Sequence, residues 1–301
     1  MIFNKVGTSI MIISDTHEHT PNITGMPPVD VLIHTGDLTN FGDLETLRAS
    51  IEMLNTIPAE LKLVIAGNHD ISLDPIRRVE NMTDDEYANL HAAALEIMTG
   101  SEVRSNNIQY LSEDTYNFSL ENGAKFTVYA SPYTPGSGGW AFPYELTEDR
   151  FNDAKQIAPN RKSIATSPIP AGVDIVMTHG PPYSILDQVD GQNIGCPNLL
   201  RAVSRVKPLM HCFGHIHEGH GANLVTWNRD GSVKDPKAAT PLETEQVNEW
   251  PSACEWRIRR GEQTLMVNAA MVVNTAGGMK PRNVPFVVVL DLERGDNSRG
   301  N

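Results

Sequence analysis

Five short motifs along the chain combine carboxylate, amide and imidazole side chains, which are common ligands of divalent metal ions. The motifs are Asp15-Thr16-His17, Gly36-Asp37, Gly67-Asn68-His69-Asp70, His179-Gly180 and Gly214-His215-Ile216-His217. Imidazole nitrogens with carboxylate and amide oxygens suit Mn, Fe, Zn or Ni better than they suit thiolate-seeking metals, Ca or Mg. The candidate ligands are Asp15, His17, Asp37, Asn68, His179, His215 and His217.

These seven ligands are too many for one tetrahedral ion, but they suit two ions if one carboxylate bridges them. Two dications facing two carboxylates keep a net positive charge, which attracts a phosphate group. A water between the ions loses its proton near neutral pH, because metal binding lowers its pKa from about 15.7 to roughly 7. The motifs therefore predict hydrolysis of a phosphate ester, with a metal-bridging hydroxide attacking phosphorus in line.

An apolar run that is typical of a buried strand precedes each motif. The runs are Ile10–Ile13, Val29–His34, Leu61–Ala66, Asp174–Thr178 and Leu209–Phe213. Ligands of open α/β sheets bind at the carboxyl ends of the strands. We therefore expect the five loops to meet at one edge of a sheet.

Helices and further strands fill the remaining chain. Asp43 is a predicted N-cap for a helix that continues to Leu54, and Thr83 with Glu86 forms a capping box for a helix that ends at about Thr99. The other expected elements are a hairpin of Tyr116–Leu120 with Lys125–Ala130, and strands at Thr264–Asn274 and Phe286–Leu292. Early strand–helix alternation and a strand-rich end predict an α/β sandwich with a mixed sheet.

The organisation that we expect is a single domain over residues 1–301. The stretch 228–261 is polar, contains three prolines and lacks periodicity, so we interpret it as a surface insertion. The chain has 24 basic and 37 acidic residues and a formal charge of −13, which disfavours binding to duplex nucleic acid or to an anionic membrane. A small phosphate ester is still a suitable partner, because bound metal ions reverse the local potential.

Cysteine usage indicates reduced thiols. The three cysteines, Cys196, Cys212 and Cys254, are odd in number and have no CxxC spacing. The first apolar run is too short for a signal peptide or a membrane span. We therefore expect a cytoplasmic protein.

The motifs resemble those of the calcineurin-like metallophosphoesterases. The resemblance is closest to the MPPED-type branch, which is similar to class III cyclic nucleotide phosphodiesterases. It rests on the segments Asp30–Asp37 (DVLIHTGD), Thr178–Pro182 (THGPP) and Phe213–Gly219 (FGHIHEG), and it covers roughly residues 9 to 225. It implies a four-layer α/β/β/α sandwich with a central mixed β-sandwich.

The resemblance also implies a role for each site residue. Asp15, His17, Asp37 and His217 surround the first ion. Asp37 bridges the two ions, and Asn68, His179 and His215 complete the ligand set of the second ion. His69 faces the leaving-group oxygen as an acid or charge stabiliser, and Asp70 positions its ring. Catalysis then falls to Asp37, His69 and Asp70, while Asn68 and His69 also contact the substrate. Manganese is the ion that we expect to support activity in vitro.

One departure from the family narrows the substrate class. Phosphoprotein phosphatases of this superfamily carry Gly-Asp-x-x-Asp-Arg-Gly, in which the Arg grips the phosphate. Here the sequence is Gly36-Asp37-Leu38-Thr39-Asn40-Phe41-Gly42, so Phe41 replaces that Arg. A dianionic monoester loses its bidentate clamp. We therefore predict a phosphodiesterase that acts on a small nucleotide-like diester.

Several alternatives stay open at this point. Trp140 either stacks on a nucleobase as a substrate-binding residue or packs its own loop. His34 is either a partner of a ligand residue or a core histidine, and for His211 the core is favoured. The alternative functions are a phosphomonoesterase, a Lewis-acid centre acting on a non-phosphate substrate in a biosynthetic pathway, and a non-catalytic binding protein.

Overall fold

The structure is a computed structural model. It describes residues 5–23, 26, 28–76, 79, 81–136, 139–230, 232, 240–241, 254–255 and 258–295.

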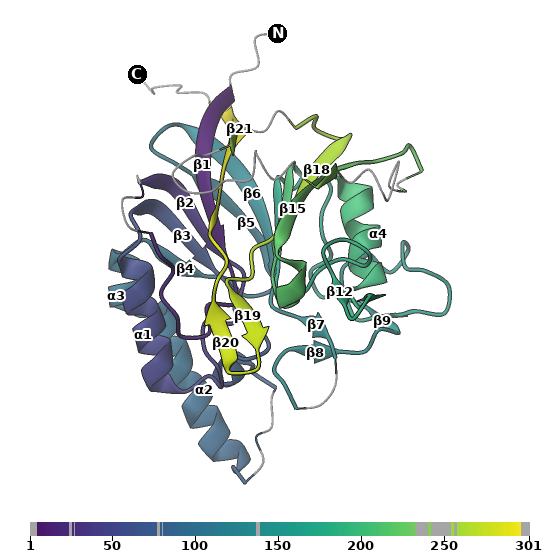
Figure 1. The fold of residues 1–301 in the computed structure, drawn as a ribbon. Coiled ribbons are helices and arrows are strands. Elements are labelled where there is room, and N and C mark those ends of the chain that lie inside the picture. The colour runs from purple at the N-terminus through teal and green to yellow at the C-terminus, as the bar shows by residue number, and fades with distance from the viewer. Residues whose placement is uncertain are drawn as a thin grey trace, which may run out of the picture.

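One half of the structure is a parallel sheet covered by helices on one face. Its strands, in order across the sheet, are β1 (Lys5–Ile13), β2 (Val29–His34), β3 (Ala59–Val64) and β4 (Ile108–Tyr110). The helices, which lie together in Figure 1, are α1 (Leu44–Asn55), α2 (Asp84–Thr99) and α3 (Ser101–Ser105). Side chains alternate along β1, so Met11 and Ile13 pack in the helix-covered cluster while Ile10 and Ile12 pack on the other face.

The other half is built on strands that come later in the chain. They are β5 (Asp114–Ser119), β6 (Ala124–Ser131), β11 (Ile175–Thr178), β14 (Met210–Phe213), β18 (Gln263–Asn268), β15 (Gly221–Thr226) and β16 (Thr240–Pro241). The four strands β6, β11, β14 and β18 are parallel. Helix α4 (Pro197–Val206) covers the outer face, where Leu199, Ala202 and Val203 pack with Val176 and Phe213.

A long strand near the C-terminus joins the halves. Strand β21 (Phe286–Arg294) pairs antiparallel with β1 along eight residues, and its pairing with β6 involves Glu293 and Arg294. Strand β17 (Cys254–Glu255) adds to it. Because the connection is narrow, the halves face each other, and Ile12 of one half shares a buried cluster with Met177 of the other. The layers are therefore helix, sheet, sheet, helix, as expected.

The loops between the main strands contain short strand pairs and 3-10 turns. The short strand pairs are β7 (Thr134–Pro135) with β8 (Pro143–Tyr144), β9 (Glu148–Asp149) with β10 (Lys162–Ser163), β12 (Gln188–Val189) with β13 (Gln192–Asn193), and β19 (Val272–Thr275) with β20 (Gly278–Pro281). Two 3-10 turns, η1 (Ile71–Leu73) and η2 (His217–Gly219), follow β3 and β14.

The helix starts that we predicted are confirmed. Asp43 accepts a hydrogen bond from the Thr46 backbone at the start of α1, and Thr83 and Glu86 form the capping box of α2. Helix α4 was not predicted. It begins with Pro197, and the Cys196 sulfur caps it by accepting from the backbone of Leu199.

The strand expected at Thr264–Asn274 is wrong, because the chain breaks into β18 and β19. The break falls where the chain crosses between the halves: Ala269 donates to Phe213 of β14, and Met271 donates to Ser14 beside β1. The Asn268 side chain accepts from the Ala270 backbone and stabilises this crossing. Sequence periodicity carries no signal for such a change of partner.

Most of the expected insertion at 228–261 lies outside the described residues. Within it, β16 pairs with β15 and β17 pairs with β21. The buried Trp227 precedes the stretch, and its indole N–H donates to Thr264 at 2.9 Å. Among the described residues, no helix has the length and apolar character needed to cross a membrane.

Candidate metal centre

The seven candidate ligands converge from the carboxyl ends of five parallel strands. Asp15 and His17 follow β1, and Asp37 and Asn68 follow β2 and β3. His179 follows β11, and the remaining two histidines follow β14. Three groups of ligand atoms each lie within 4.8 Å of one another. They are Asp15 with His17 and His217, His17 with Asp37 and His69, and Asp37 with His179 and His215.

Asp37 occupies the middle of the cluster. One of its oxygens, Oδ2, lies 3.5 Å from His17 Nε2 and 3.4 Å from His179 Nε2. On one side, Asp15 Oδ1 lies 3.2 Å from His217 Nε2. On the other side, the Asn68 side-chain oxygen lies 2.9 Å from His179 Nε2 and 2.7 Å from His215 Nδ1. The arrangement is therefore two groups of donors with one carboxylate between them.

The cluster has the chemistry that a pair of divalent cations requires. Both ring nitrogens of His17 and Nδ1 of His217 are buried and have no hydrogen-bond partner in the described structure. Unpartnered buried nitrogens are costly unless a cation accepts their lone pairs. A Cβ atom at Gly67 would collide with Asp37, and one at Gly214 would collide with Asp15. The residues therefore fit divalent metal ions.

The charges in the cluster are strongly coupled. Burial would raise the pKa of Asp37, but the neighbouring His179 outweighs it and lowers this pKa to about 2. Burial lowers the pKa of His179, whereas Asp37 and Asp15 raise it to about 9. His179 thus holds a proton where a metal ion would be bound, and metal binding would release that proton.

The backbone at the ligands is strained. Asp15, His17, Asp37 and His215 all adopt positive φ angles, of 49°, 43°, 55° and 68°. Such conformations are unfavourable for residues with a Cβ atom, and they persist where the surrounding structure enforces them. Here the enforcing contacts are backbone hydrogen bonds, such as Asp15 to the Gly36 carbonyl at 2.9 Å. Strain of this kind is typical of a site held in readiness for a ligand.

Two buried histidines support the ligand loops from inside the strands. The Gly36 amide donates to His34 Nδ1 at 3.2 Å, so the other ring nitrogen carries the proton and donates to Thr16 Oγ1. His211 repeats the device, because its Nε2 contacts Thr178 Oγ1 at 2.8 Å. Burial lowers the pKa of His34 to about 4 and that of His211 to about 3. Both residues are therefore neutral positioning groups.

The expectation that Asp70 positions the ring of His69 is wrong. The carboxylate of Asp70 accepts hydrogen bonds from the backbones of Leu38, Thr39 and Gly67 and from the Thr39 hydroxyl. It ties together the loops that carry Asp37 and Asn68. The ring of His69 is oriented by a main-chain group that has no sequence signal, because its Nδ1 lies 2.8 Å from the Asn40 carbonyl oxygen.

Trp140 lies against the centre. Its ring centroid is 4.0 Å from that of His69 and 6.4 Å from that of Phe41, to which it is nearly parallel at 16°. The next residue, Ala141, donates to the Asn68 carbonyl at 2.9 Å. Trp140 is still 38% exposed and Phe41 is 68% exposed. We refer to Phe41, Trp140 and His69 as the aromatic shelf.

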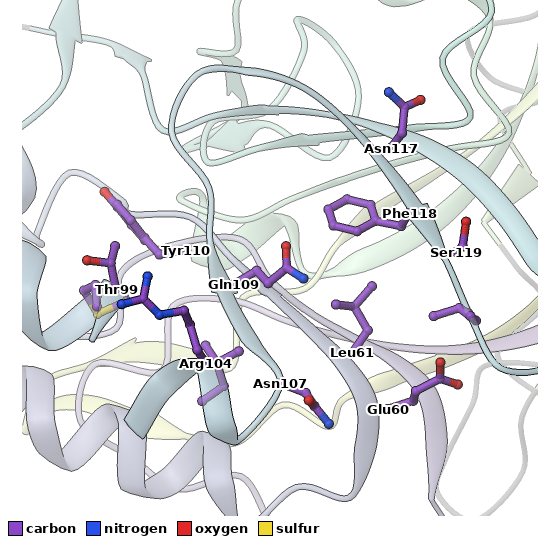
Figure 2. Close-up of a pocket in the computed structure, with 13 residues that line it drawn as sticks. Glu60, Leu61, Thr99, Arg104, Asn107, Gln109, Tyr110, Asn117, Phe118 and Ser119 are labelled. Carbon is purple, nitrogen blue, oxygen red and sulfur yellow. The ribbon is translucent and has the colours of Figure 1, made fainter. Parts of the chain in front are cut away.

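A cavity of about 320 Å³ meets the centre at His215. A larger cavity, of about 670 Å³, lies elsewhere between β4 and β5 (Figure 2). Its walls include Arg104, Gln109, Tyr110 and Phe118 but none of the candidate ligands. The larger cavity is therefore no part of this centre.

Known proteins are similar to this chain over the region that contains the ligand motifs. The sequence profile described as calcineurin-like phosphoesterase matches residues 8–219. Metallophosphoesterase domain-containing protein 1 of Homo sapiens is 36% identical over 219 residues, which cover 71% of this chain and 62% of that protein. UPF0046 protein K07C11.7 of Caenorhabditis elegans is 35% identical over 212 residues, covering 70% of this chain and 64% of that protein.

A third relative is much longer. A protein of Emericella nidulans named probable rhamnogalacturonate lyase C is 30% identical over 299 residues, which cover 95% of this chain and 24% of that protein. The chain thus spans less than two thirds of the length of each of these three relatives. The profile match, by contrast, covers more than half of this chain and includes every candidate ligand. The chain belongs to the calcineurin-like phosphoesterase family.

Proposed function

We propose that the protein is a metal-dependent phosphodiesterase that hydrolyses a small, nucleotide-like phosphodiester. Asp15, His17, Asp37 and His217 would hold one divalent ion, and Asp37 with Asn68, His179 and His215 would hold the other. Two bound ions supply Lewis acidity and an activated water for attack at phosphorus. Family membership supports the phosphoesterase chemistry, and the choice of a diester rests on the side chains around the centre.

The observation that favours a diester is the residue that stands where phosphoprotein phosphatases carry a phosphate-gripping Arg. In the described residues, no Lys or Arg side chain pairs with any of the seven proposed ligands. The position of the phosphate-gripping Arg of the phosphoprotein phosphatases is taken by the exposed Phe41. A dianionic monoester gains most from an Arg, whereas a diester carries one negative charge and a second organic arm. The exposed aromatic shelf offers a surface for one of the two arms.

His69 and Trp140 have distinct parts in this proposal. Because Nδ1 of His69 donates to the Asn40 carbonyl, Nε2 is the nitrogen available to the leaving-group oxygen. With both ring nitrogens protonated, the Nε2 proton would stabilise the departing alkoxide. Trp140 would carry a nucleobase or aryl group by stacking, which is worth on the order of 1–3 kcal/mol per base. Asn68 would contact the substrate through its amide.

The test is a comparison of two chromogenic esters with the same leaving group. Metal-replete protein is assayed with bis(p-nitrophenyl) phosphate and with p-nitrophenyl phosphate. We expect kcat/KM to favour the diester, and we expect Phe41→Arg to shift the ratio towards the monoester. A wild-type preference for the monoester would replace the proposal with a phosphomonoesterase. No turnover of any phosphate ester by a protein with both ions bound would favour Lewis-acid chemistry on another substrate.

A further inference from the structure

We propose that the cavity beside His215 is a subsite for the arm of the diester that does not leave, and that it accepts an uncharged or cationic aliphatic group and excludes an anionic one. This inference rests on the proposed function. We call the cavity the retained-arm pocket. Its walls are Pro135, Gly136, Glu145, Leu146, Pro181, Ile194, Gly195 and His215.

The position of the pocket relative to the shelf separates the two arms. The shelf meets the cluster at His69, whose ring centroid is 4.8 Å from that of His17. The pocket meets the cluster at His215, whose ring centroid is 5.1 Å from that of His179. If His69 serves the leaving oxygen, the arm attached to that oxygen lies along the shelf. The other ester arm then points towards His215.

Half of the described wall residues of the pocket carry aliphatic side chains. Leu146 is 46% exposed and Ile194 is 44% exposed, although both are large and apolar, and prolines complete the surface. Exposed aliphatic side chains in a concave wall beside a proposed metal centre are suited to an apolar ligand group. A volume of about 320 Å³ is at the lower end of the range for small-molecule sites.

The charge of the pocket opposes anions. Among the wall residues that the structure describes, Glu145 is the only carboxylate, and there is no Lys or Arg. A second phosphate or a carboxylate on the retained arm would therefore lie near Glu145 with no basic partner. An amine or quaternary ammonium would be attracted, while an uncharged alkyl group would be accepted by the apolar walls.

The loop that carries Ile194 is fixed, so the pocket is a built feature. Asp187 is fully buried, and its Oδ2 accepts from the backbones of Ser184 at 2.8 Å and Gly195 at 2.9 Å. A Cβ atom at Gly195 would lie 2.5 Å from the Pro182 carbonyl oxygen, so only glycine permits this close approach. The backbone of Cys196 donates to the Pro181 carbonyl at 3.0 Å and closes the loop.

The experiment uses three p-nitrophenyl phosphodiesters that differ only in the retained arm: ethyl, choline and 2-carboxyethyl. Metal-replete wild-type protein is compared with Glu145→Lys and with Glu121→Lys, an exposed carboxylate outside the pocket. We expect wild type to hydrolyse the ethyl and choline esters better than the carboxyethyl ester. We expect Glu145→Lys to shift the choline-to-carboxyethyl ratio of kcat/KM by about tenfold, and Glu121→Lys to leave it unchanged.

The outcomes separate the two proposals. Turnover of the ethyl ester with an unchanged ratio in Glu145→Lys would overturn the pocket assignment and leave the phosphodiesterase proposal intact. A wild-type preference for the carboxyethyl ester would also overturn it. Absence of turnover for all three esters, with both metal ions present by elemental analysis, would overturn the proposed function and the pocket assignment with it.

Discussion

The two halves of the sandwich contribute to the centre in different ways. The half built on β1, β2 and β3 supplies ligands from turns that follow the strands at once, and Asp15 and Asp37 are almost fully buried there. The half built on β11 and β14 supplies the buried His179 together with His215 and His217, which are only partly buried, and its loops form the retained-arm pocket. The first half therefore holds its ligands close to the strand ends, and the longer loops of the second half leave space for substrate.

The halves nevertheless share one supporting device. In each, a buried strand histidine contacts a threonine hydroxyl beside a ligand: His34 with Thr16, and His211 with Thr178. The two halves thus differ in the loops that lie beyond these histidine–threonine contacts. We therefore expect the strand ends to set the metal geometry and the longer loops to set the substrate specificity.

The largest effect should come from the carboxylate between the two groups of ligands. We expect Asp37→Asn to lower kcat/KM by at least about 10³-fold, because the amide is neutral and a poor bridge between two cations. Its Oδ1 can still accept from the His69 backbone, so the fold should persist. Elemental analysis should find less than two ions per chain. Asp114→Asn, at an exposed site, is the matched control, and full activity in Asp37→Asn would contradict the bridging role.

The next largest effect should come from Asp70, whose carboxylate holds the ligand loops of the first half together. Asp70→Ala removes the acceptor for four hydrogen bonds that join the Asp37 and Asn68 loops. We expect metal affinity to fall by roughly 10–100-fold, together with a loss of about 3 kcal/mol of unfolding free energy. Metal titration and urea unfolding measure the two quantities. A change in the pH–rate profile with unaltered metal affinity would instead return Asp70 to the role of a catalytic partner of His69.

The features of this molecule that the sequence predicts are those that depend on local motifs. The five ligand loops were predictable, because each motif follows its own apolar run and needs no knowledge of distant residues. The contact between the Asn40 carbonyl and the His69 ring was not predictable, because any residue type has a backbone carbonyl. The walls around Glu145 and Ile194 come from segments that only tertiary folding brings together, and the strand break at Ala269 depends on pairing with β14 and Ser14.

A smaller effect should follow from removing the shelf. We expect Trp140→Ala to raise KM for methyl p-nitrophenyl phosphate about tenfold, as one lost stacking contact with the leaving aryl arm would, with little change in kcat. Methyl trifluoroethyl phosphate, whose aliphatic leaving arm gains little from a stacking surface, serves as the comparison substrate. Trp140→Phe should recover most of the loss. Equal losses on both substrates would indicate that Trp140 only supports His69.

The smallest effect concerns the supporting histidine of the second half. Burial lowers the pKa of His211 to about 3 in the folded protein, against about 6.5 when unfolded. The unfolded chain therefore binds more protons below pH 6.5, and this residue's contribution to stability is lost as the pH falls towards 3. At pH 5 this proton binding by the unfolded chain lowers the unfolding free energy by on the order of 2 kcal/mol.

In His211→Gln the unfolding free energy should therefore decline less steeply between pH 7 and pH 5 than in wild type. Urea unfolding of both proteins across that range provides the measurement. Parallel declines would show that His211 does not remain neutral in the folded protein.

The bridging position of Asp37 between two metal ions can be tested by anomalous diffraction from crystals grown with manganese. We expect two peaks, about 3.5–4 Å apart, with Asp37 oxygen density between them and with His217 and Asn68 on opposite sides. A single peak with both groups of ligands around it, or two peaks that Asp37 does not join, would rule out a bridging Asp37.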